Sequence, residues 1–233
     1  MKRLLITGAS RGIGLATARL FAGEGWQVVN VSRRAIPLAG ARQLSIDLAD
    51  PGWDRAHGAE LLAAVRDSTQ LCLVHNAGLL SKDSVEDLDG ERLACALQVN
   101  VVAAQQLNRL LLPLMPRGSS IVYVGSTLGE KAVAGACAYV VSKHAQIGLM
   151  RATCQDLAGR GIHTACVCPG FTDTEMLRSH VSGDESVIAA IAAGVTMGRL
   201  VEPEEIAALI RFCALNPVVN GAVIHANLGQ IER

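Results

Sequence analysis

Tyr139 and Lys143, four positions apart, are the side chains of this sequence best suited to acid/base chemistry. In a helix, residues i and i+4 lie on the same face, one turn apart. A free tyrosine has a pKa of about 10, and a lysine ammonium within about 4–6 Å favours the phenolate and lowers that pKa. The pair is therefore expected to exchange a proton near neutral pH. The alternative is a chance spacing that places a partly buried ring beside a solvated amine.

A glycine-rich segment near the N-terminus, Thr7-Gly-Ala-Ser-Arg-Gly-Ile-Gly14, has the setting of a phosphate-binding turn. It follows the aliphatic run Leu4-Leu5-Ile6 and precedes a helical pattern at 15–22, which predicts a strand, a turn and a helix. The glycines permit a sharp turn and close approach to a ligand, while the N–H groups and dipole of the helix attract phosphate. The spacing G-x-x-x-G-x-G differs from G-x-G-x-x-G and from the phosphate loop. A nucleotide is expected here, and an ordinary turn is the alternative.

The residues after the second predicted strand, 26–31, indicate which nucleotide is bound. Ser32-Arg33-Arg34 stands about 20 residues beyond the glycine turn, where an NAD-binding fold places an acid for the ribose hydroxyls. No acid is present there. Arginine can instead hold a ribose 2′-phosphate through its planar set of donors, and Arg11 could contact the same phosphate. The sequence therefore predicts NADP(H), and a pair of solvated arginines is the alternative.

Other candidate site residues also follow predicted strands. Asp47-Leu48 comes after strand 42–46 and is expected either to contact adenine or to cap the next helix. His75-Asn-Ala-Gly78 follows strand 71–74, and its small residues allow close approach to a cofactor. Ser126 comes just after strand 121–124. Asn100 lies within a mostly helical segment as a buried-looking polar group that needs partners.

The elements that position these residues alternate between strands and helices. Strands are predicted at 4–6, 26–31, 42–46, 71–74, 121–124, 162–168 and 221–226, helices at 15–22, 54–67, 91–114, 138–159 and 203–214, and a looser segment at 171–197. This rhythm predicts an α/β fold of βαβ units with a parallel sheet and right-handed crossovers. Neither a repeat nor a linker is visible, so residues 1–233 are expected to form a single domain.

The composition limits the classes of partner. Half of the residues are hydrophobic, 18% are charged and 3% are aromatic, which suits an aliphatic core around a buried parallel sheet. The formal net charge is zero and there is no basic block with interleaved aromatic residues, so neither nucleic acid nor a membrane is expected as a partner. The apolar stretches are too short for a membrane span or a signal peptide, which predicts a cytoplasmic protein.

The seven cysteines are scattered, mostly within apolar segments, and are expected to be reduced core residues. Cys166 and Cys168 have a strand-like i, i+2 spacing, and no paired cysteine or histidine ligands follow them. A metal site is therefore not expected.

Together these motifs resemble the short-chain dehydrogenase/reductase family, and the resemblance covers essentially the whole chain with the motifs in order. It is carried by Thr7-Gly-Ala-Ser-Arg-Gly-Ile-Gly14, Asp47-Leu48, Asn76-Ala-Gly78, Asn100, Ser126, Tyr139-x-x-x-Lys143 and Pro169-Gly-Phe-Thr-Asp-Thr174. The resemblance implies a three-layer, doubly wound Rossmann fold of about seven parallel strands with helices on both faces. It also implies a homotetramer or homodimer.

The resemblance implies a catalytic tetrad of Asn100, Ser126, Tyr139 and Lys143. Tyr139 would give a proton to a carbonyl oxygen as hydride arrives from NADPH, and Ser126 would stabilise the charge on that oxygen. Lys143 would hold the nicotinamide ribose and keep the pKa of the phenol low, and Asn100 would anchor a water between Lys143 and solvent. The implied cofactor site comprises Gly8, Ser10, Arg11, Gly12, Ile13, Gly14, Ser32, Arg33, Asp47, Leu48, Asn76, Ala77, Gly78, Tyr139, Lys143, Pro169, Gly170, Thr172 and Thr174.

Three positions depart from the family pattern. His75 replaces an asparagine often found before Asn-Ala-Gly, and is interpreted as a buried histidine with one satisfied nitrogen rather than a catalytic one. Val141 replaces an alanine, which changes packing but leaves the spacing of the catalytic pair intact. Asn227 and Leu228 stand in place of the usual Asp-Gly, which affects the expected C-terminal contacts and subunit packing.

The segment after Gly170 is expected to be a lid over a mainly apolar pocket. The apolar residues proposed for this pocket, which could equally be ordinary packing, are Leu79, Leu128, Val133, Phe171, Met176, Leu177 and Met197. The expected substrate is a small carbonyl or secondary alcohol on an aliphatic or cyclic skeleton. A 3-oxoacyl thioester on an acyl-carrier protein is the competitor, and would need basic residues near the pocket mouth. A non-catalytic NADP(H)-binding regulator and, less favoured, a methyltransferase are the remaining alternatives.

Overall fold

A single parallel sheet of seven strands forms the centre of the protein in the computed structural model, which describes residues 1–231. Residues 232 and 233 of the expected domain lie outside the described residues. The strands are β1 (Lys2–Thr7), β2 (Gln27–Val31), β3 (Arg42–Leu44), β4 (Gln70–His75), β5 (Ser120–Val124), β6 (His163–Pro169) and β7 (Ala222–Ala226). Their order in the sheet is β3-β2-β1-β4-β5-β6-β7. The chain adds β2 and β3 on one side of β1 and then β4 to β7 on the other side, so the strand order reverses between β1 and β4. Ligands of such sheets bind at this reversal, beyond the carboxyl ends of the strands.

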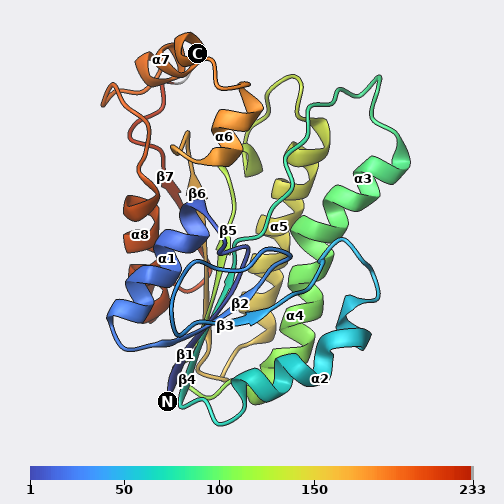
Figure 1. Ribbon diagram of the computed structural model, residues 1–233, viewed down its shortest axis with the longest axis vertical. Coiled ribbons are helices and arrows are strands. Elements are labelled where there is room, and N and C mark those ends of the chain that lie inside the picture. The colour runs from blue at the N-terminus through green and yellow to red at the C-terminus, as the bar shows by residue number, and fades with distance from the viewer. Residues whose placement is uncertain (232–233) are drawn as a thin grey trace.

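Helices cover both faces of the sheet, as Figure 1 shows. On one face lie α1 (Gly12–Gly23) and α8 (Pro203–Leu215), and on the other lie α2 (Trp53–Val65), α4 (Ala103–Leu111) and α5 (Cys137–Asp156). Strand residues alternate between the two layers, since Leu4 and Ile6 pack with α1 and α8 while Leu5 packs with the opposite layer. The predicted three-layer, doubly wound architecture is confirmed.

The long helix predicted at 91–114 is interrupted. It consists of α3 (Gly90–Leu97), a π-helical segment (Gln98–Val102), α4 and a final 3₁₀ turn (Leu112–Leu114). Asn100 lies in the π-helical segment, and such segments are frequent at functional sites. The sequence did not reveal this break, because all four pieces are helical and follow one another without a gap.

The segment predicted as a looser lid, 171–197, contains two short helices, α6 (Glu175–His180) and α7 (Glu185–Ala193). They lie at the top of Figure 1, beyond the carboxyl ends of the strands. Neither of the two hydrophobic clusters that sandwich the sheet includes a residue of this segment. None of the helices within residues 1–231 is long and apolar enough to cross a membrane.

Candidate active site

The glycine turn between β1 and α1 has a backbone that requires glycine. Gly8 and Gly12 have φ of +72° and +55°, in the left-handed region. A Cβ on Gly14 would lie 2.5 Å from Nδ2 of Asn76 and 2.6 Å from the Gly8 carbonyl oxygen. The Asn76 amide donates to the carbonyl oxygens of Thr7 (2.9 Å) and Gly8 (3.1 Å), which locks the turn after β4 onto the glycine turn.

This turn suits a phosphate group. Arg11 is the N-cap residue of α1 in an extended conformation, and no side chain caps the helix. The first N–H groups of a helix have no intrahelical acceptor, so they are available to an anion together with the positive end of the helix dipole. The donors of residues 12–14 therefore fit the diphosphate of a dinucleotide, as the sequence predicts.

A buried asparagine, Asn30, forms hydrogen bonds with the residues after β2, and it was not among the predicted site residues. Asn30, fully buried, accepts from the backbone N–H of Ala9 (2.9 Å) and donates to Oγ of Ser32 (2.8 Å) and Oε1 of Gln43 (2.7 Å). It thereby connects the glycine turn to Ser32. A polar residue within the aliphatic strand Val-Val-Asn-Val was the available signal.

Arg33 and Asp47 lie next to each other at the edge of this site. Their side chains are 74% and 51% exposed, and Nη1 of Arg33 is 4.0 Å from Oδ2 of Asp47. Asp47 also accepts from the backbone N–H of Ala49 (3.0 Å), so it caps the turn that follows it. Contact between Asp47 and adenine stays a prediction.

The predicted catalytic residues come together where β5 ends against α5. The ammonium nitrogen of Lys143 is 5.5 Å from the ring centre of Tyr139. It donates to the Val124 carbonyl oxygen (2.8 Å) and to Oε1 of Gln146 (3.0 Å), and the lysine is 3% exposed. Ser126 is the second residue after β5, and its hydroxyl accepts from the N–H of Leu128 (3.1 Å).

Burial controls the protonation of this pair. It raises the pKa of Tyr139 to about 12, although an interaction with the Ser126 hydroxyl acts in the opposite direction. It also lowers the pKa of Lys143 to about 8. The prediction that the pKa of Tyr139 is lowered is wrong for this structure, because desolvation of the phenolate outweighs the opposing hydrogen bond with Ser126.

Asn100 contacts the loop after β4 and helix α5 rather than Lys143. Its Oδ1 accepts from the N–H of Leu79 (2.7 Å), and its Nδ2 donates to the Leu79 carbonyl oxygen (3.0 Å) and to Oγ of Ser142 (2.8 Å). A cavity of about 10 Å³, lined in part by Asn100, His75 and Gln146, lies beside these contacts. That volume is about the size of one water molecule. The role of Asn100 in holding a water stays a prediction.

His75 belongs to a buried hydrogen-bond chain behind the site. Its Nε2 lies 2.8 Å from Oδ1 of Asn108, whose Nδ2 donates to the Tyr123 hydroxyl (2.6 Å). That hydroxyl lies 3.1 Å from Oγ1 of Thr153 on α5. Burial lowers the pKa of His75 to about 4, so the ring is neutral near pH 7. The interpretation of His75 as a buried histidine with one satisfied nitrogen is confirmed.

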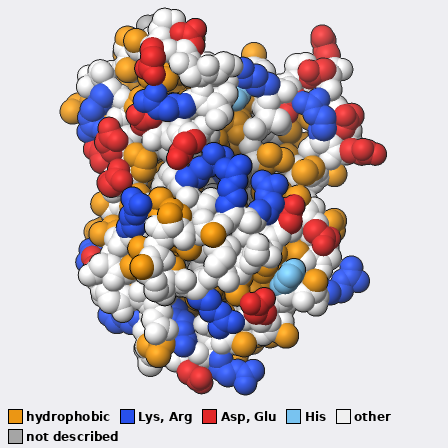
Figure 2. All heavy atoms as spheres, in the orientation of Figure 1, with side chains coloured by type: hydrophobic (Ala, Val, Ile, Leu, Met, Phe, Trp, Pro, Cys, Tyr) orange, Lys and Arg blue, Asp and Glu red, His pale blue; other side chains and the backbone are white. Residues whose placement is uncertain are grey.

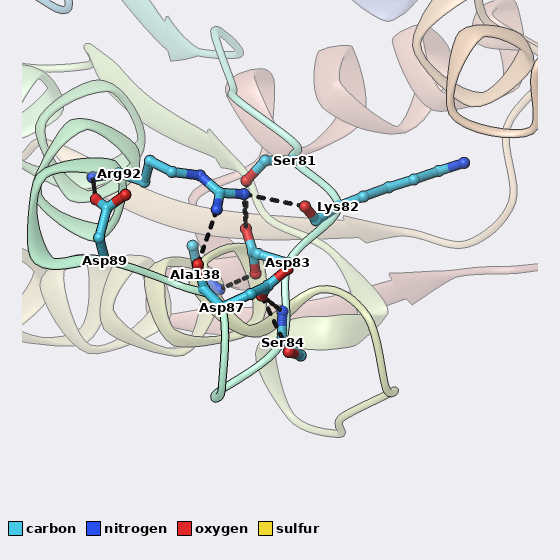
Figure 3. Close-up of polar contacts among 8 residues, drawn as sticks. All are labelled: Ser81, Lys82, Asp83, Ser84, Asp87, Asp89, Arg92 and Ala138. Carbon is cyan, nitrogen blue, oxygen red and sulfur yellow. Dashed lines mark hydrogen bonds and ion pairs between the residues drawn. The ribbon is translucent and has the colours of Figure 1, made fainter.

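Asp83 is a structural residue of the site that the sequence did not reveal. The N-cap residue of α5, Ala136, offers no side-chain cap, and Oδ1 of Asp83 accepts from the N–H of Ala138 (2.9 Å) in its place. Asp83 is 3% exposed, and Nη2 of Arg92 lies 4.0 Å from its carboxylate. Arg92 also donates to the Lys82 carbonyl oxygen (3.1 Å). Figure 3 shows Arg92 of α3 facing Asp83, which lies in the loop between β4 and α3.

The turn after β6 also meets the glycine turn. A Cβ on Gly12 would lie 3.2 Å from Cγ2 of Thr174, and a Cβ on Gly170 would lie 2.6 Å from Cβ of Asn227. Asn227, one of the departures from the family pattern, therefore supports the Pro-Gly turn. Leu228 has φ of +52°, a conformation that is strained for a residue other than glycine.

A cleft of about 380 Å³ lies between the start of α1, the start of α6 and the start of α8. Gly12 and Thr174 line it, whereas Tyr139 and Lys143 do not, so it borders the glycine turn and is separate from the predicted catalytic pair. Lys and Arg side chains gather near the middle of the face shown in Figure 2, below the lid. Four of the apolar residues expected in the pocket are exposed, namely Val133 (51%), Phe171 (36%), Met176 (39%) and Met197 (63%).

The cysteines take no part in disulfides. All seven are free, as expected, and Sγ of Cys166 lies 3.8 Å from Sγ of Cys168 beneath Gly125. Within residues 1–231, no group of three or more His, Cys, Asp or Glu side chains could hold a metal ion.

The structure thus brings most of the predicted site residues into one region at the carboxyl ends of the strands. Contacts or near approaches join Gly8 with Ala77, Gly14 with Asn76, Gly12 with Thr174, and Gly78 with both Asn100 and Lys143. Ser10, Ile13, Leu48, Pro169 and Thr172 lie on the same turns and strand ends. This arrangement can bind a dinucleotide next to a proton-donating phenol.

Comparison with known proteins finds a family model and curated relatives that match nearly the whole chain. The family model described as enoyl-(acyl carrier protein) reductase matches residues 8–230. The 3-oxoacyl-[acyl-carrier-protein] reductase FabG of Vibrio cholerae is 32% identical over 242 residues, covering 98% of this chain and 97% of the relative.

Solved structures agree as well. The ligand-free aldohexose dehydrogenase of Thermoplasma acidophilum superposes with a TM-score of 0.89 at 27% identity, covering 98% of this chain and 94% of that protein. A 4-hydroxyisoleucine dehydrogenase complexed with NADH, at 22% identity and a TM-score of 0.86 over 99% of this chain and 98% of its own, shares the fold. The chain belongs to the short-chain dehydrogenase/reductase family of oxidoreductases.

Proposed function

We propose that this protein is an NADP(H)-dependent oxidoreductase that interconverts a carbonyl and a secondary alcohol on a small, mainly apolar substrate. The observation that carries the proposal is the meeting of Tyr139, Ser126 and Lys143 beside the glycine turn at the reversal of strand order. Residues 1–233 would act as one unit, in the cytoplasm, with neither nucleic acid nor a membrane as partner.

The protein groups supply position and a proton. A bound nicotinamide supplies or accepts the hydride. The pKa of about 12 keeps Tyr139 protonated at neutral pH, which suits a proton donor to a carbonyl oxygen. The Ser126 hydroxyl would donate to the same oxygen and stabilise the charge that develops on it. The buried Lys143 ammonium places a positive charge beside the phenol and beside Gly78.

The preference for NADP(H) rests on the residues after β2. Ser32 is held by Asn30, and the exposed Arg33 guanidinium follows it directly, so both can face a ribose 2′-phosphate. Arg11 in the glycine turn is also exposed and could contact the same 2′-phosphate. No carboxylate stands at the position that would favour the free 2′-hydroxyl.

A 3-oxoacyl thioester on an acyl-carrier protein is the second candidate substrate, because that activity is in the name of the Vibrio cholerae relative. An aliphatic acyl chain also suits the apolar lid residues. A homotetramer or homodimer is proposed as the assembly. Val102 and Val141 are 40% and 43% exposed on the π-helical segment and α5, and would be covered by such a partner.

The test is the substitution Tyr139→Phe, measured as NADPH oxidation with a panel of carbonyl compounds that includes a 3-oxoacyl thioester. Loss of the proton donor should lower kcat by about 10²–10⁴-fold. The dissociation constant of NADPH should stay within about threefold, since the ring is retained. The matched control is Tyr123→Phe, which removes the other tyrosine hydroxyl of the chain from the buried chain behind the site. Unchanged turnover in Tyr139→Phe would favour the non-catalytic regulator.

A further inference from the structure

We propose that Gln146 is a positioning residue that fixes the location and the charge state of the Lys143 ammonium. This inference rests on the proposed function, in which Lys143 acts beside Tyr139. Gln146 was not singled out by any sequence motif, and its contact with Lys143 became visible only in the structure.

The geometry of the contact is specific. Gln146 lies three residues after Lys143 on α5, where side chains are neighbours on the helix surface, and it is 1% exposed. Its Oε1 accepts from the Lys143 ammonium at 3.0 Å, and the Val124 carbonyl oxygen accepts from the same nitrogen at 2.8 Å. Since an ammonium only donates, the amide oxygen and not the amide nitrogen must face it.

Both acceptors are neutral, and this determines what the contact does. Within the described part of the chain, no carboxylate forms an ion pair with Lys143. The titratable groups that face it are Tyr139 on the same helix and the thiols of Cys166 and Cys168 on β6, and His75 of β4 borders the same small cavity as Gln146. Gln146 therefore holds the cation in place without neutralising it, so its charge remains available to a bound cofactor or to the phenol.

The identity of the side chain at 146 should then set the proton affinity of Lys143. Burial lowers the pKa of Lys143 to about 8, and electrostatic interactions with the thiols of Cys166 and Cys168 act in the opposite direction. As a general rule, a hydrogen bond to the charged form of a group also favours that form. The change Gln146→Met removes one acceptor and should lower the pKa of Lys143 further. The change Gln146→Glu puts a carboxylate against the ammonium and should raise the pKa by about 1–3 units.

The experiment is an NMR titration of the lysine ε-carbons, labelled with ¹³C, in the full chain. The chain has only four lysines, Lys2, Lys82, Lys131 and Lys143, so the signal of Lys143 can be assigned by its loss in Lys143→Arg. The proposal expects Lys143 to titrate near 8 in the native chain, higher in Gln146→Glu and lower in Gln146→Met. The other three signals serve as internal controls.

The matched control is Gln155→Glu, the same chemical change at an exposed position of α5, which should leave the Lys143 signal unmoved. A Lys143 titration that shifts by less than about 0.3 unit in both Gln146 variants overturns the proposal, since a carboxylate at 3 Å cannot be silent. If Gln146→Glu does not fold, the Lys143 titration in Gln146→Met tests the proposal by itself, because the pKa is expected to move in a defined direction, downward.

Activity provides the second readout. In the reduction assay, the pH at which kcat/KM falls on the alkaline side should move upward in Gln146→Glu and downward in Gln146→Met. The NMR titration needs no turnover, so it can succeed even if Tyr139→Phe shows that the reaction was wrongly assigned. Conversely, Tyr139→Phe can abolish turnover while the Lys143 titration is the same in the Gln146 variants as in the native chain. That pair of results supports the proposed function and rejects only the role of Gln146.

Discussion

Arg33 places an exposed guanidinium directly after the serine that Asn30 holds at the end of β2. Its nearest carboxylate, on Asp47, is 4.0 Å away, and both side chains are more than half exposed. Such a pair contributes little to folding, because solvent screens it. The value of Arg33 is therefore expected to lie in binding, where a phosphate can accept two parallel hydrogen bonds from the guanidinium.

Replacing this guanidinium, in Arg33→Ser, should lower kcat/KM for NADPH by about tenfold or more, since a hydrogen bond to a charged group is worth roughly 1.5–3 kcal/mol. For NADH, which lacks the 2′-phosphate, the change should be less than about threefold. Steady-state kinetics with both cofactors checks the ratio. Arg42→Ser removes the same charge from β3 and should leave the ratio unchanged. A native enzyme that prefers NADH by a wide margin would contradict the cofactor assignment itself.

At the residue scale, the sequence identified side chains by type and spacing but not by environment. Tyr139 and Lys143 were found because four residues make one helical turn, and the structure places them 5.5 Å apart, ring centre to nitrogen. The direction of the tyrosine pKa shift was missed, because it depends on burial by residues from other elements. Asn30 was missed for the same reason, because its partners Ala9 and Gln43 come from other elements. Gln146 is only three residues from Lys143, but spacing alone does not show that its amide oxygen accepts from a buried ammonium.

At the element scale, helix α5 depends on a cap from outside itself. Its N-cap residue is an alanine, and the carboxylate of Asp83 supplies the missing acceptor from 55 positions away in the chain. The periodic pattern predicted the helix within a few residues of its bounds, but a cap so distant in sequence leaves no local signal. The same limit hid the π-helical break around Asn100. The start of α5 carries Tyr139, so this cap should affect the site as well as the helix.

Removing the cap, in Asp83→Ala, should cost about 1–3 kcal/mol of unfolding free energy, because a buried N–H group loses its acceptor. It should also lower kcat, since Tyr139 lies one residue beyond that group. Asp83→Asn keeps an acceptor oxygen and should recover part of both losses. Urea unfolding and steady-state kinetics provide the two measurements.

Asp89→Ala is the matched control for this cap. Asp89 caps α3 by accepting from the N–H of Arg92 at 2.8 Å, away from Tyr139. Its loss should reduce stability by about 1 kcal/mol with little change in kcat. Equal losses of kcat in Asp83→Ala and Asp89→Ala would mean that the cap matters only for global stability.

At the scale of the whole molecule, the alternation of strands and helices was enough to predict the sheet and its parallel sense, whereas the two helix layers were predicted from the family resemblance. Most of the strands contain a short aliphatic run, and β4–β6 and the last four residues of β1 are buried almost throughout, which is the pattern of a parallel sheet. The lid helices α6 and α7, of 6 and 9 residues, were not predicted. Helices this short carry too few turns for a clear apolar stripe.

The lid is held mainly by polar contacts, so the molecule combines a firmly packed sheet with a weakly anchored segment. Arg178 of α6 donates from Nε and Nη2 to the two carboxylate oxygens of Asp173 (2.6 and 2.8 Å). Its Nη1 donates to Glu185 at the start of α7 (3.0 Å). One side chain thus joins the strand-side end of the lid to both of its helices. Segments with few buried apolar contacts open at a lower free energy than the core.

Replacing Arg178 by methionine should therefore raise amide hydrogen exchange across 175–193 by roughly 2- to 10-fold, as expected for losing a bidentate surface pair. Exchange in β1, β4, β5 and α5 should not change, because the backbone hydrogen bonds of these elements break only when the core unfolds. If the lid contacts substrate as proposed, KM should rise while kcat changes little, since Tyr139 is untouched. Arg199→Met, which breaks a similar bidentate pair with Glu205 at 2.7 Å, should not affect the lid. A uniform rise across the whole chain would instead mean that Arg178 stabilises the core, and that the lid is part of the same cooperative unit.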